Sequence, residues 1–215
     1  MKKLFFVGAV ALFASVNAQE VKFGAKAGYA MSTISMSIDG LGLTINTNSK
    51  STFYAGALVE YQLNDKFALQ GEVLYSPLGG EYTVEESFMG DSFKATSKVD
   101  LGTLLIPIGA KYYVSEQFAL GAGLNFGIIM SAKNNYTETT TVGGVTETVS
   151  TSEDMKDEIN SLNLAPYLGA EYNLSNGLFF DARYNLGVSN LAKDSGEGKW
   201  KNSFFQIGLG YKFGN

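Results

Sequence analysis

The chain has 215 residues, no cysteine, no histidine and a formal net charge of −5 at pH 7. These absences exclude a Ser-His-Asp or Cys-His catalytic triad, a zinc site built from cysteine or histidine, and a disulfide framework. The balance of 16 basic against 21 acidic residues argues against a nucleic-acid partner, which would need a basic face. We therefore expect a protein that is not an enzyme, with no catalytic residue, no metal site and no cofactor.

The first eighteen residues have the organisation of a secretory signal peptide. Two lysines precede an apolar run, and small residues stand at the −3 and −1 positions of a cleavage site between Ala18 and Gln19. The apolar run is shorter than the roughly 20 residues that a membrane-spanning helix needs. We expect residues 1–18 to be a cleaved signal peptide and residues 19–215 to form a single exported barrel domain.

The rest of the chain alternates apolar residues with polar residues or glycine. Every second residue from Leu178 to Val188 is apolar, for example, which is the periodicity of a β-strand with two different faces. No segment after the signal peptide has the 3.6-residue apolar stripe of an amphipathic helix. The alternation predicts strands near residues 21–35, 52–63, 67–76, 99–114, 118–131, 160–174, 178–190 and 201–213.

A short internal repeat indicates how these strands are connected. Each copy contains the end of one strand, a three-residue polar turn and the start of the next strand. The three turns are Asn64-Asp65-Lys66, Ser115-Glu116-Gln117 and Ser175-Asn176-Gly177, and Gly177 suits the left-handed position that such turns often contain. Antiparallel pairing places these turns and both termini at one end of the sheet.

The opposite end of the predicted sheet carries four long connections. They are residues 36–51, 77–98, 132–159 and 191–200. Outer-membrane barrels combine an even number of strands with short periplasmic turns and long extracellular loops, whereas a soluble barrel has no reason to sort its loops by length. The pattern predicts an all-β, eight-stranded antiparallel up-and-down transmembrane barrel.

The spacing of aromatic residues indicates which face of the barrel meets lipid. Aromatic residues on the apolar face occur in pairs eight residues apart: Phe53 and Tyr61, Phe67 and Tyr75, Phe118 and Phe126, Phe205 and Phe213. At about 3.3 Å per residue and a tilt near 40°, eight residues rise roughly 20 Å, close to the apolar band of about 25 Å between two aromatic girdles. We expect the apolar face to point into outer-membrane lipid, with Tyr112, Tyr172 and Tyr211 completing the girdles. A soluble sandwich, whose apolar face points inward, is the alternative.

Charged residues occupy the opposite face of several predicted strands. Counting inward positions from the short turns gives a lower layer of Lys26, Glu60, Lys111, Glu171 and Asp181, and an upper layer of Glu72 and Arg183. The strands of Glu72 and Arg183 face each other in an eight-stranded barrel, so these two side chains are predicted to meet near the axis, where neighbouring glycines leave room. Eight strands enclose only enough space for side chains, and a buried charge must be paired, so we expect a salt-bridged plug and no open pore. A path for protons or ions is the alternative use of these charges.

The longest connection has a nearly mirrored sequence around Gly143-Gly144. Threonine and valine favour strands and a glycine pair favours a hairpin turn, so we expect the flanking strands to continue beyond the membrane as a polar hairpin. Asp39-Gly40 and Gly90-Asp91 are predicted to close similar hairpins. The carboxylates of Glu153, Asp154, Asp157 and Glu158 are interpreted as a solvated acidic rim, because their spacing matches no calcium loop.

Three stretches of sequence carry a resemblance to a known family. They are FGAKAGY (23–29), LLIPIGAKYY (104–113) and FQIGLGYKF (205–213). Through them the chain resembles the small outer-membrane β-barrel domain family often labelled porin-like or PorT-like, and in architecture the OmpA/OmpX-type eight-stranded barrels. The resemblance implies insertion by the barrel-insertion machinery, which often reads a terminal aromatic residue; here Gly214-Asn215 follow Phe213.

The expected function follows from the barrel and its loops rather than from a catalytic site. We expect a monomer in the cell outer membrane that acts through its extracellular loops, in surface interaction or envelope integrity, on a ligand or partner that the sequence does not identify. A small passive or gated channel is the first alternative. A soluble exported lipid carrier is another, whereas known outer-membrane enzymes use a histidine, which this chain lacks.

Overall fold

The structure is a computed structural model, and it describes residues 21–38, 43–193 and 198–213. The expected signal peptide and its cleavage site therefore lie outside the described residues. The described strands are β1 (Val21–Ile38), β2 (Leu43–Asn46), β3 (Lys50–Asn64), β4 (Phe67–Phe88), β5 (Asp91–Tyr113), β6 (Phe118–Val142), β7 (Val145–Asp154), β8 (Leu162–Asn173), β9 (Leu178–Asn185) and β10 (Lys199–Phe213). Within this part of the chain, no helix has the length and hydrophobicity needed to cross a membrane.

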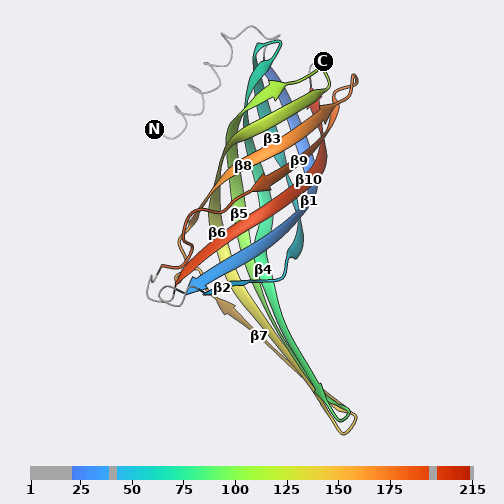
Figure 1. The fold of residues 1–215 in the computed structure, drawn as a ribbon, viewed down its shortest axis with the longest axis vertical. Coiled ribbons are helices and arrows are strands. Elements are labelled where there is room, and N and C mark those ends of the chain that lie inside the picture. Colours follow the sequence, from blue (N-terminus) through green and yellow to red (C-terminus); the bar gives the residue numbers. More distant parts are fainter. Residues whose placement is uncertain (1–20, 39–42, 194–197, 214–215) are drawn as a thin grey trace, which may run out of the picture.

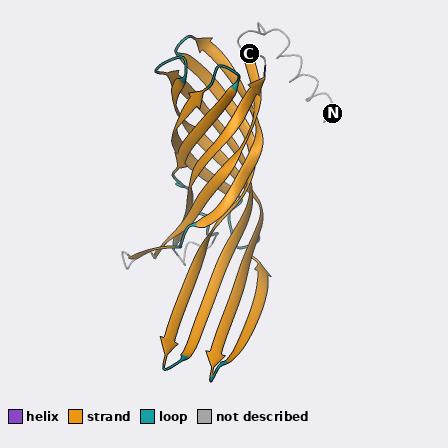
Figure 2. Ribbon diagram, turned by 90° about the vertical axis from the view of Figure 1, so that its right-hand side faces the viewer, coloured by secondary structure: helices purple, strands orange, loops and turns teal. Residues whose placement is uncertain are grey.

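Eight of the ten strands form one closed ring. Their hydrogen-bonded order is β10-β9-β8-β6-β5-β4-β3-β1, and β1 pairs with β10 to complete the circle. Every neighbouring pair in the ring is antiparallel. Figures 1 and 2 show the resulting barrel, whose strands are inclined to its long axis. The predicted eight-stranded antiparallel up-and-down barrel is confirmed.

The three short turns join the predicted strands at one end of the ring. Gly177 has a φ of 87°, the left-handed conformation that its position predicted. The first turn has no glycine, and there the side chain of Asn64 accepts hydrogen bonds from the backbone N–H groups of Lys66 at 2.9 Å and Phe67 at 3.0 Å. An Asx-type interaction of this kind holds the chain in a turn without a glycine.

Two of the four long connections are hairpins formed by strands that continue out of the ring. Strands β4 and β5 run through residues 77–98 and meet at a two-residue turn, Met89-Gly90, with φ of 49° and 94°. Strand β6 likewise continues to Val142, and Gly143-Gly144 turns the chain into β7 with φ of 57° and 82°. The predicted hairpin at Gly143-Gly144 is confirmed, and the other predicted hairpin turns at Met89-Gly90, one residue before the expected Gly90-Asp91. The strands around Met89-Gly90 were predicted too short, because Glu86, Asp91 and Ser97 interrupt the apolar alternation by which strands were recognised.

Other boundaries also differ from the prediction. The strand predicted for 178–190 ends at Asn185. The second strand of the long hairpin is β7, and residues 155–161 separate it from β8. Pro166, on the neighbouring strand β8, has no backbone N–H to donate to the chain beyond Asn185. Serine hydroxyls replace part of the backbone hydrogen bonding there. Ser203 accepts a hydrogen bond from Gly187 N–H at 3.0 Å, and Ser189 accepts one from Leu164 N–H at 2.8 Å. In the first long connection, β2 pairs with the end of β1, while Asp39-Gly40 lies outside the described residues.

Three strands of the ring, β4, β5 and β6, continue beyond it at the end opposite the short turns. Strand β7 pairs with β6 there, and together they form a four-stranded sheet of residues 81–100 and 133–154, which we call the arm. Figures 1 and 2 show the arm projecting away from the barrel as a single layer. The remaining space inside the ring is filled by side chains, and these divide into a charged half near the short turns and an apolar half near the arm.

Candidate functional site

The inward positions of the ring hold all of the predicted lumen charges. Each of these side chains is buried, with at most 6% of its residue exposed: Lys26, Glu60, Glu72, Lys111, Glu171, Asp181 and Arg183. Buried charges are tolerated only when they are paired and hydrogen-bonded. The arrangement of partners therefore decides whether this group closes the lumen.

Four residues near the short turns form a cycle of alternating charge. Lys111 Nζ lies 2.8 Å from Glu60 and 2.5 Å from Glu171. Lys212 Nζ lies 2.9 Å from the same carboxylate of Glu60 and 2.7 Å from Glu171. Lys212 was not among the predicted lumen residues, although its place between the outward Tyr211 and Phe213 marks it as inward.

A second group lies further along the axis. Arg183 Nη2 is 2.6 Å from Glu72, the contact expected near the axis, and Lys26 Nζ lies 3.1 Å from Glu72 and 2.9 Å from Asp181. Lys26 and Asp181 thus belong with Glu72 and Arg183, not with the lower layer in which they were predicted. The strands are inclined and staggered, so residues at the same number of steps from a turn differ in height.

Together the two groups contain four cations and four carboxylates, each with an oppositely charged partner. Tyr113 adds a hydrogen bond from its hydroxyl to Glu60 at 2.8 Å, and Gln70 donates to Glu72. The network carries no net charge, and it spans the interior from one wall to the other. This half of the lumen is therefore filled and electrostatically balanced.

The glycines around the charges make room for aromatic rings rather than for the charged side chains alone. A Cβ at Gly208 would lie 2.2 Å from the Tyr54 hydroxyl, and a Cβ at Gly210 would lie 2.3 Å from the Phe179 ring. Tyr54 and Phe179 are both 1% exposed. The prediction that these glycines leave space for ion pairs is thus only part of the explanation, because it did not include the rings.

These rings also contact the cations of the network. Lys26 Nζ lies 5.5 Å from the Tyr54 ring centre, Arg183 Cζ lies 4.8 Å from that of Tyr167, and Lys212 Nζ lies 5.2 Å from that of Phe179. Distances below about 6 Å permit a favourable cation–π interaction. The rings therefore stabilise the buried cations as well as filling space.

Toward the arm the interior becomes uncharged and then apolar. Asn125 donates to Asn185 at 3.0 Å, and Asn185 donates to Gln206 at 3.2 Å. Beyond these amides lies an apolar cluster, which we call the mouth cluster: Ala30, Ile34, Tyr54, Leu74, Leu78, Leu101, Leu105, Ile129, Ala132, Ile159, Leu191 and Phe204.

Two connecting segments cover the mouth cluster. Residues 155–161 and 186–193 meet through a bridge between Ile159 and Ala192, and Asn160 N–H donates to the Leu191 carbonyl at 2.7 Å. The side chain of Asn160 adds hydrogen bonds to the carbonyls of Asn190 at 3.0 Å and Ala192 at 3.1 Å. Ile159 and Leu191 are 3% and 2% exposed, so these segments close the ring at the arm end.

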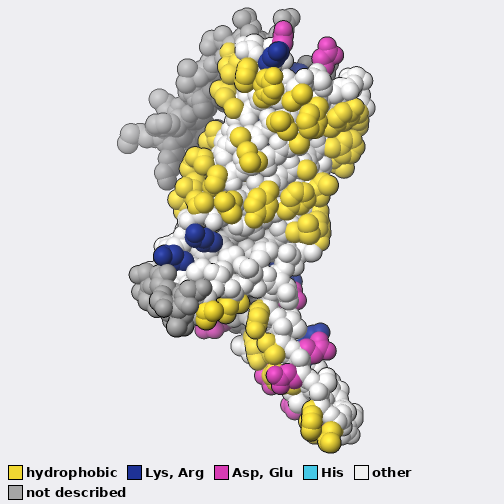
Figure 3. All heavy atoms as spheres, viewed as in Figure 1, with side chains coloured by type: hydrophobic (Ala, Val, Ile, Leu, Met, Phe, Trp, Pro, Cys, Tyr) yellow, Lys and Arg dark blue, Asp and Glu magenta, His cyan; other side chains and the backbone are white. Residues whose placement is uncertain are grey.

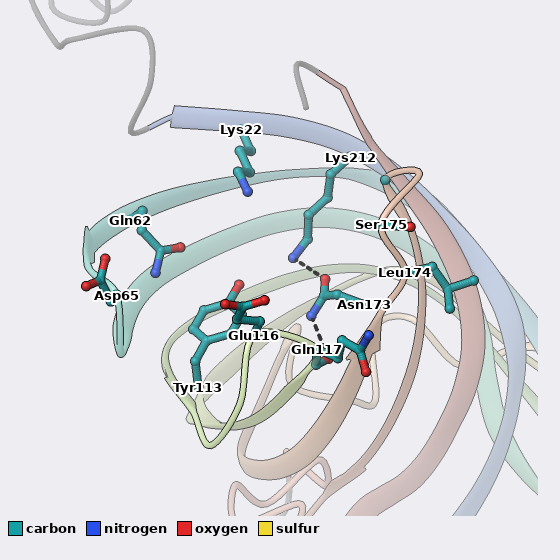
Figure 4. Close-up of a pocket in the computed structure, with 11 residues that line it drawn as sticks. Lys22, Gln62, Asp65, Tyr113, Glu116, Gln117, Asn173, Leu174, Ser175 and Lys212 are labelled. Carbon is teal, nitrogen blue, oxygen red and sulfur yellow. Dashed lines mark hydrogen bonds between the residues drawn. The ribbon is translucent and has the colours of Figure 1, made fainter.

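The short-turn end of the ring opens into a polar cavity of about 470 Å³. Figure 4 shows Lys22 and Lys212 pointing into it from neighbouring strands, with Asn173 and Gln117 below. Lys212 Nζ donates to Asn173 at 3.0 Å, and Asn173 donates to the Gln117 carbonyl at 3.4 Å. Because Lys212 also belongs to the ion-pair network, the cavity ends where the filled interior begins.

The aromatic residues predicted for the girdles all lie on the outer surface. Eight of them are exposed, Phe53, Phe67, Tyr75, Tyr112, Phe118, Tyr172, Tyr211 and Phe213, and three are half-buried, Tyr61, Phe126 and Phe205. On the face that Figure 3 shows, charged side chains gather at the two ends of the ring and on the arm, with hydrophobic side chains between. Their role as membrane girdles is an interpretation of this placement.

The arm has two faces, which the strand register defines. Leu101 and Ala132 point into the mouth cluster, so the residues at two-residue intervals beyond them form the face that continues the inner wall. This inner face comprises Tyr82, Val84, Glu86, Phe88, Asp91, Phe93, Ala95, Ser97, Val99, Asn134, Tyr136, Glu138, Thr140, Val142, Val145, Glu147, Val149, Thr151 and Glu153. The outer face comprises Glu81, Thr83, Glu85, Ser87, Ser92, Lys94, Thr96, Lys98, Asp100, Lys133, Asn135, Thr137, Thr139, Thr141, Thr146, Thr148, Ser150, Ser152 and Asp154.

The acidic residues after the long hairpin are exposed, in agreement with a solvated rim. They are Glu153, Asp154, Asp157 and Glu158. In the described ranges, no group of three or more carboxylates has an arrangement that would hold a metal ion.

The chain is similar to one protein family and to several solved structures. A model of the outer membrane protein beta-barrel domain matches residues 17–193. Among solved structures, Ail, the attachment invasion locus protein of Yersinia pestis, is 20% identical with a TM-score of 0.46, covering 90% of this chain and 99% of its own. Neisserial surface protein A is 15% identical with a TM-score of 0.44, covering 89% and 97%. OprG from Pseudomonas aeruginosa is 17% identical with a TM-score of 0.41, covering 91% and 97%.

No curated protein matches the chain. The narrower PorT-like label stays a prediction. Since the family model spans most of the sequence and the strands close into the expected ring, the chain belongs to the outer membrane protein β-barrel domain family.

Proposed function

We propose that this outer-membrane protein acts at the cell surface through its arm, in surface interaction or envelope integrity, and that its barrel serves as a closed, non-enzymatic membrane anchor. The observation that carries the proposal is the contrast between a filled interior and a long, ordered extracellular sheet. A channel would need the reverse, an open interior and loops that leave the mouth clear.

The interior supports the anchoring role. The ion-pair network fills the periplasmic half, and the mouth cluster with its two covering segments fills the extracellular half. Eight-stranded barrels are narrow enough for side chains to occupy the whole section. The carboxylates of the network are held by cations, which suits a structural role.

The arm supports the interaction role because it is a built sheet and not a set of loose loops. Its two tips are joined by a hydrogen bond from Gly143 N–H to Asp91 at 2.9 Å. Facing hydroxyls lie within hydrogen-bond distance across the strands, at 3.2 Å for Thr83 and Thr96 and for Thr139 and Thr148. A surface that is ordered before binding loses less conformational entropy when a partner docks.

Shortening the arm tests the proposal. Replacing residues 83–96 and residues 137–150 each by Asn-Gly keeps Tyr82 opposite Ser97 and Tyr136 opposite Thr151, so each hairpin closes in its native register. We expect this variant to insert and to keep a heat-modifiable gel shift, while cells that carry it lose adhesion to serum-protein-coated surfaces or resistance to detergent. Equal adhesion and equal detergent resistance in the shortened and full-length strains would contradict the proposal.

A small channel remains the second candidate, because the cavity of about 470 Å³ is open at the periplasmic end. Its test is the conductance of the purified protein in a planar bilayer. The closed arrangement of Ile159 and Leu191 over the mouth favours the anchor.

A further inference from the structure

The two faces of the arm differ sharply in chemistry. The inner face carries the aromatic and aliphatic residues of the arm, whereas the outer face carries none and consists of hydroxyls, amides and charges. On the inner face Tyr82 is 50% exposed, Val149 is 55% exposed and Phe88 is 77% exposed. A sheet ordinarily buries its apolar face against another layer, and this single-layer sheet has no second layer among the described residues.

The faces differ in charge as well. All three arm lysines, Lys94, Lys98 and Lys133, lie on the outer face, where carboxylates accompany them. The inner face has five carboxylates and no cation: Glu86, Asp91, Glu138, Glu147 and Glu153. The apolar residues of the inner face are therefore set in a negative field that the outer face does not share.

The carboxylates lie among the rings rather than in a separate patch. Glu86 is opposite Phe93 in the register, and Tyr136 donates its hydroxyl hydrogen bond to Glu138 at 3.0 Å, which also raises the pKa of the Tyr136 hydroxyl. Between the two tips, a hollow of about 580 Å³ is lined by Glu86, Phe88 and Phe93 among others. Figure 3 shows hydrophobic and acidic side chains next to one another along the arm.

We propose that the inner face of the arm is a docking surface for a cationic protein segment, one whose arginine or lysine side chains alternate with apolar ones. This inference rests on the proposed function of the arm and names the chemistry of its partner. Guanidinium groups would lie over the rings of Tyr82, Phe93 and Tyr136 and against the neighbouring carboxylates. Apolar side chains of the segment would cover Val145 and Val149, which are 74% and 55% exposed in the absence of a second layer.

Charge argues against the other occupants of this face. In a second copy of the chain, the inner face would bring carboxylates against carboxylates, with no cation on either side to offset them. A bacterial or host membrane surface, which carries negative charge, is repelled for the same reason. The inner face meets the barrel at Val99, which packs against the buried mouth cluster, so the docking surface ends there.

A direct binding measurement tests the inference with a defined probe. The full-length protein in phosphatidylcholine nanodiscs is titrated into a fluorescein-labelled twelve-residue peptide of alternating arginine and valine, and anisotropy is recorded at low and high salt. We expect saturable binding that weakens as salt rises, and no binding of the same peptide with glutamate in place of arginine. Empty nanodiscs give the background.

Two charge-matched variants locate the binding site. The inner-face variant Glu86→Gln/Glu138→Gln/Glu147→Gln and the outer-face variant Glu81→Gln/Glu85→Gln/Asp154→Asn each remove three negative charges from the same sheet, two at exposed positions and one at a half-buried position. We expect at least a tenfold rise in Kd for the first and less than a threefold rise for the second. Tyr82→Ala should raise Kd about fivefold, whereas Thr83→Ala on the outer face should leave it unchanged.

The outcomes separate this inference from the proposed function. Equal effects of the two charge variants, or no saturable binding of the arginine peptide, would overturn the docking surface. If the shortened arm abolishes adhesion while the inner-face variant adheres normally and binds the peptide normally, the arm functions through other residues. If the inner-face variant loses peptide binding but shortening the arm changes no cellular property, the surface exists and the proposed function is wrong.

Discussion

At the scale of single residues, the stability of the barrel depends on how its buried charges are compensated. Glu72 holds both Lys26 and Arg183, and without it these two cations would share Asp181 alone. Breaking a buried ion pair by removing one partner leaves an uncompensated charge. The network therefore stabilises the native barrel only while every buried charge in it has a partner.

Glu72→Gln is expected to lower the free energy of unfolding by about 3–5 kcal/mol, the range for removal of one partner of a buried pair. Denaturant titration in detergent micelles, followed by the fluorescence of Trp200, measures the change. Glu85→Gln serves as the control, because Glu85 pairs with Lys94 at 3.6 Å on the solvated arm, and its loss should change the stability by less than about 0.5 kcal/mol. Similar effects of both substitutions would contradict the buried network.

Close packing of glycine against the interior rings leads to a second prediction. In Gly208→Ala the new methyl group would lie 2.2 Å from the Tyr54 hydroxyl and 2.5 Å from the Ala27 carbonyl, so the ring and the strand must shift. Overpacking of this kind costs about 1–3 kcal/mol. Gly121→Ala is the matched control, since its methyl group would meet nothing closer than 3.8 Å. Equal unfolding midpoints for the two variants would show that the rings do not pack as described.

The alternation of side chains predicted the burial of the seven lumen charges, but it could not supply their heights or their neighbours. Lys212 shares the alternation of its strand and could have been included by the same rule. The positions of Tyr54 and Phe179 depend on glycines of other strands that meet them only in three dimensions. Strand stagger, which no local pattern encodes, decides which charges pair.

At the scale of elements, strands that lie within the membrane and strands that lie outside it leave different traces in the sequence. The membrane strands have one apolar face and were predicted within a few residues. The apolar face of the arm strands is interrupted by carboxylates, so their turn residues and β-favouring composition identified them instead. The early end of β9 at Asn185 follows from Pro166 on the neighbouring strand, a non-local cause that the alternation of β9 itself does not contain.

The turn at Gly143-Gly144 offers a test of the arm as an independent element. Gly143 has a φ of 57°, and a β-branched residue there costs about 1–2 kcal/mol. Gly143→Val should therefore increase amide hydrogen exchange at Val142 and Val145 near the tip while leaving the unfolding midpoint of the barrel unchanged. Thr146→Val, which places the same side chain in regular strand, should preserve protection. A fall in barrel stability in Gly143→Val would show that the tip and the ring unfold as one unit.

At the scale of the whole molecule, the barrel is closed twice, by the ion-pair network near the short turns and by the mouth cluster near the arm. Purified protein in a planar bilayer is expected to give no steady conductance, because the network and the mouth cluster leave no continuous aqueous path. Ile159→Asp provides the comparison: charge in the mouth cluster should loosen the covering segments and allow brief current steps. Large, steady conductance of the unmodified protein would favour the channel.

The central claim is the orientation of the two faces of the ring, with apolar side chains in lipid and charges inside. The chain has no native cysteine, so single nitroxide labels can be placed at Leu120 and Leu209, which are 48% and 56% exposed on the outer surface. In liposomes, electron paramagnetic resonance should show that these labels collide with oxygen and are shielded from a water-soluble nickel chelate, whereas a label at Thr148 on the arm should show the opposite. Chelate accessibility at Leu120 and Leu209 equal to that at Thr148 would contradict the account.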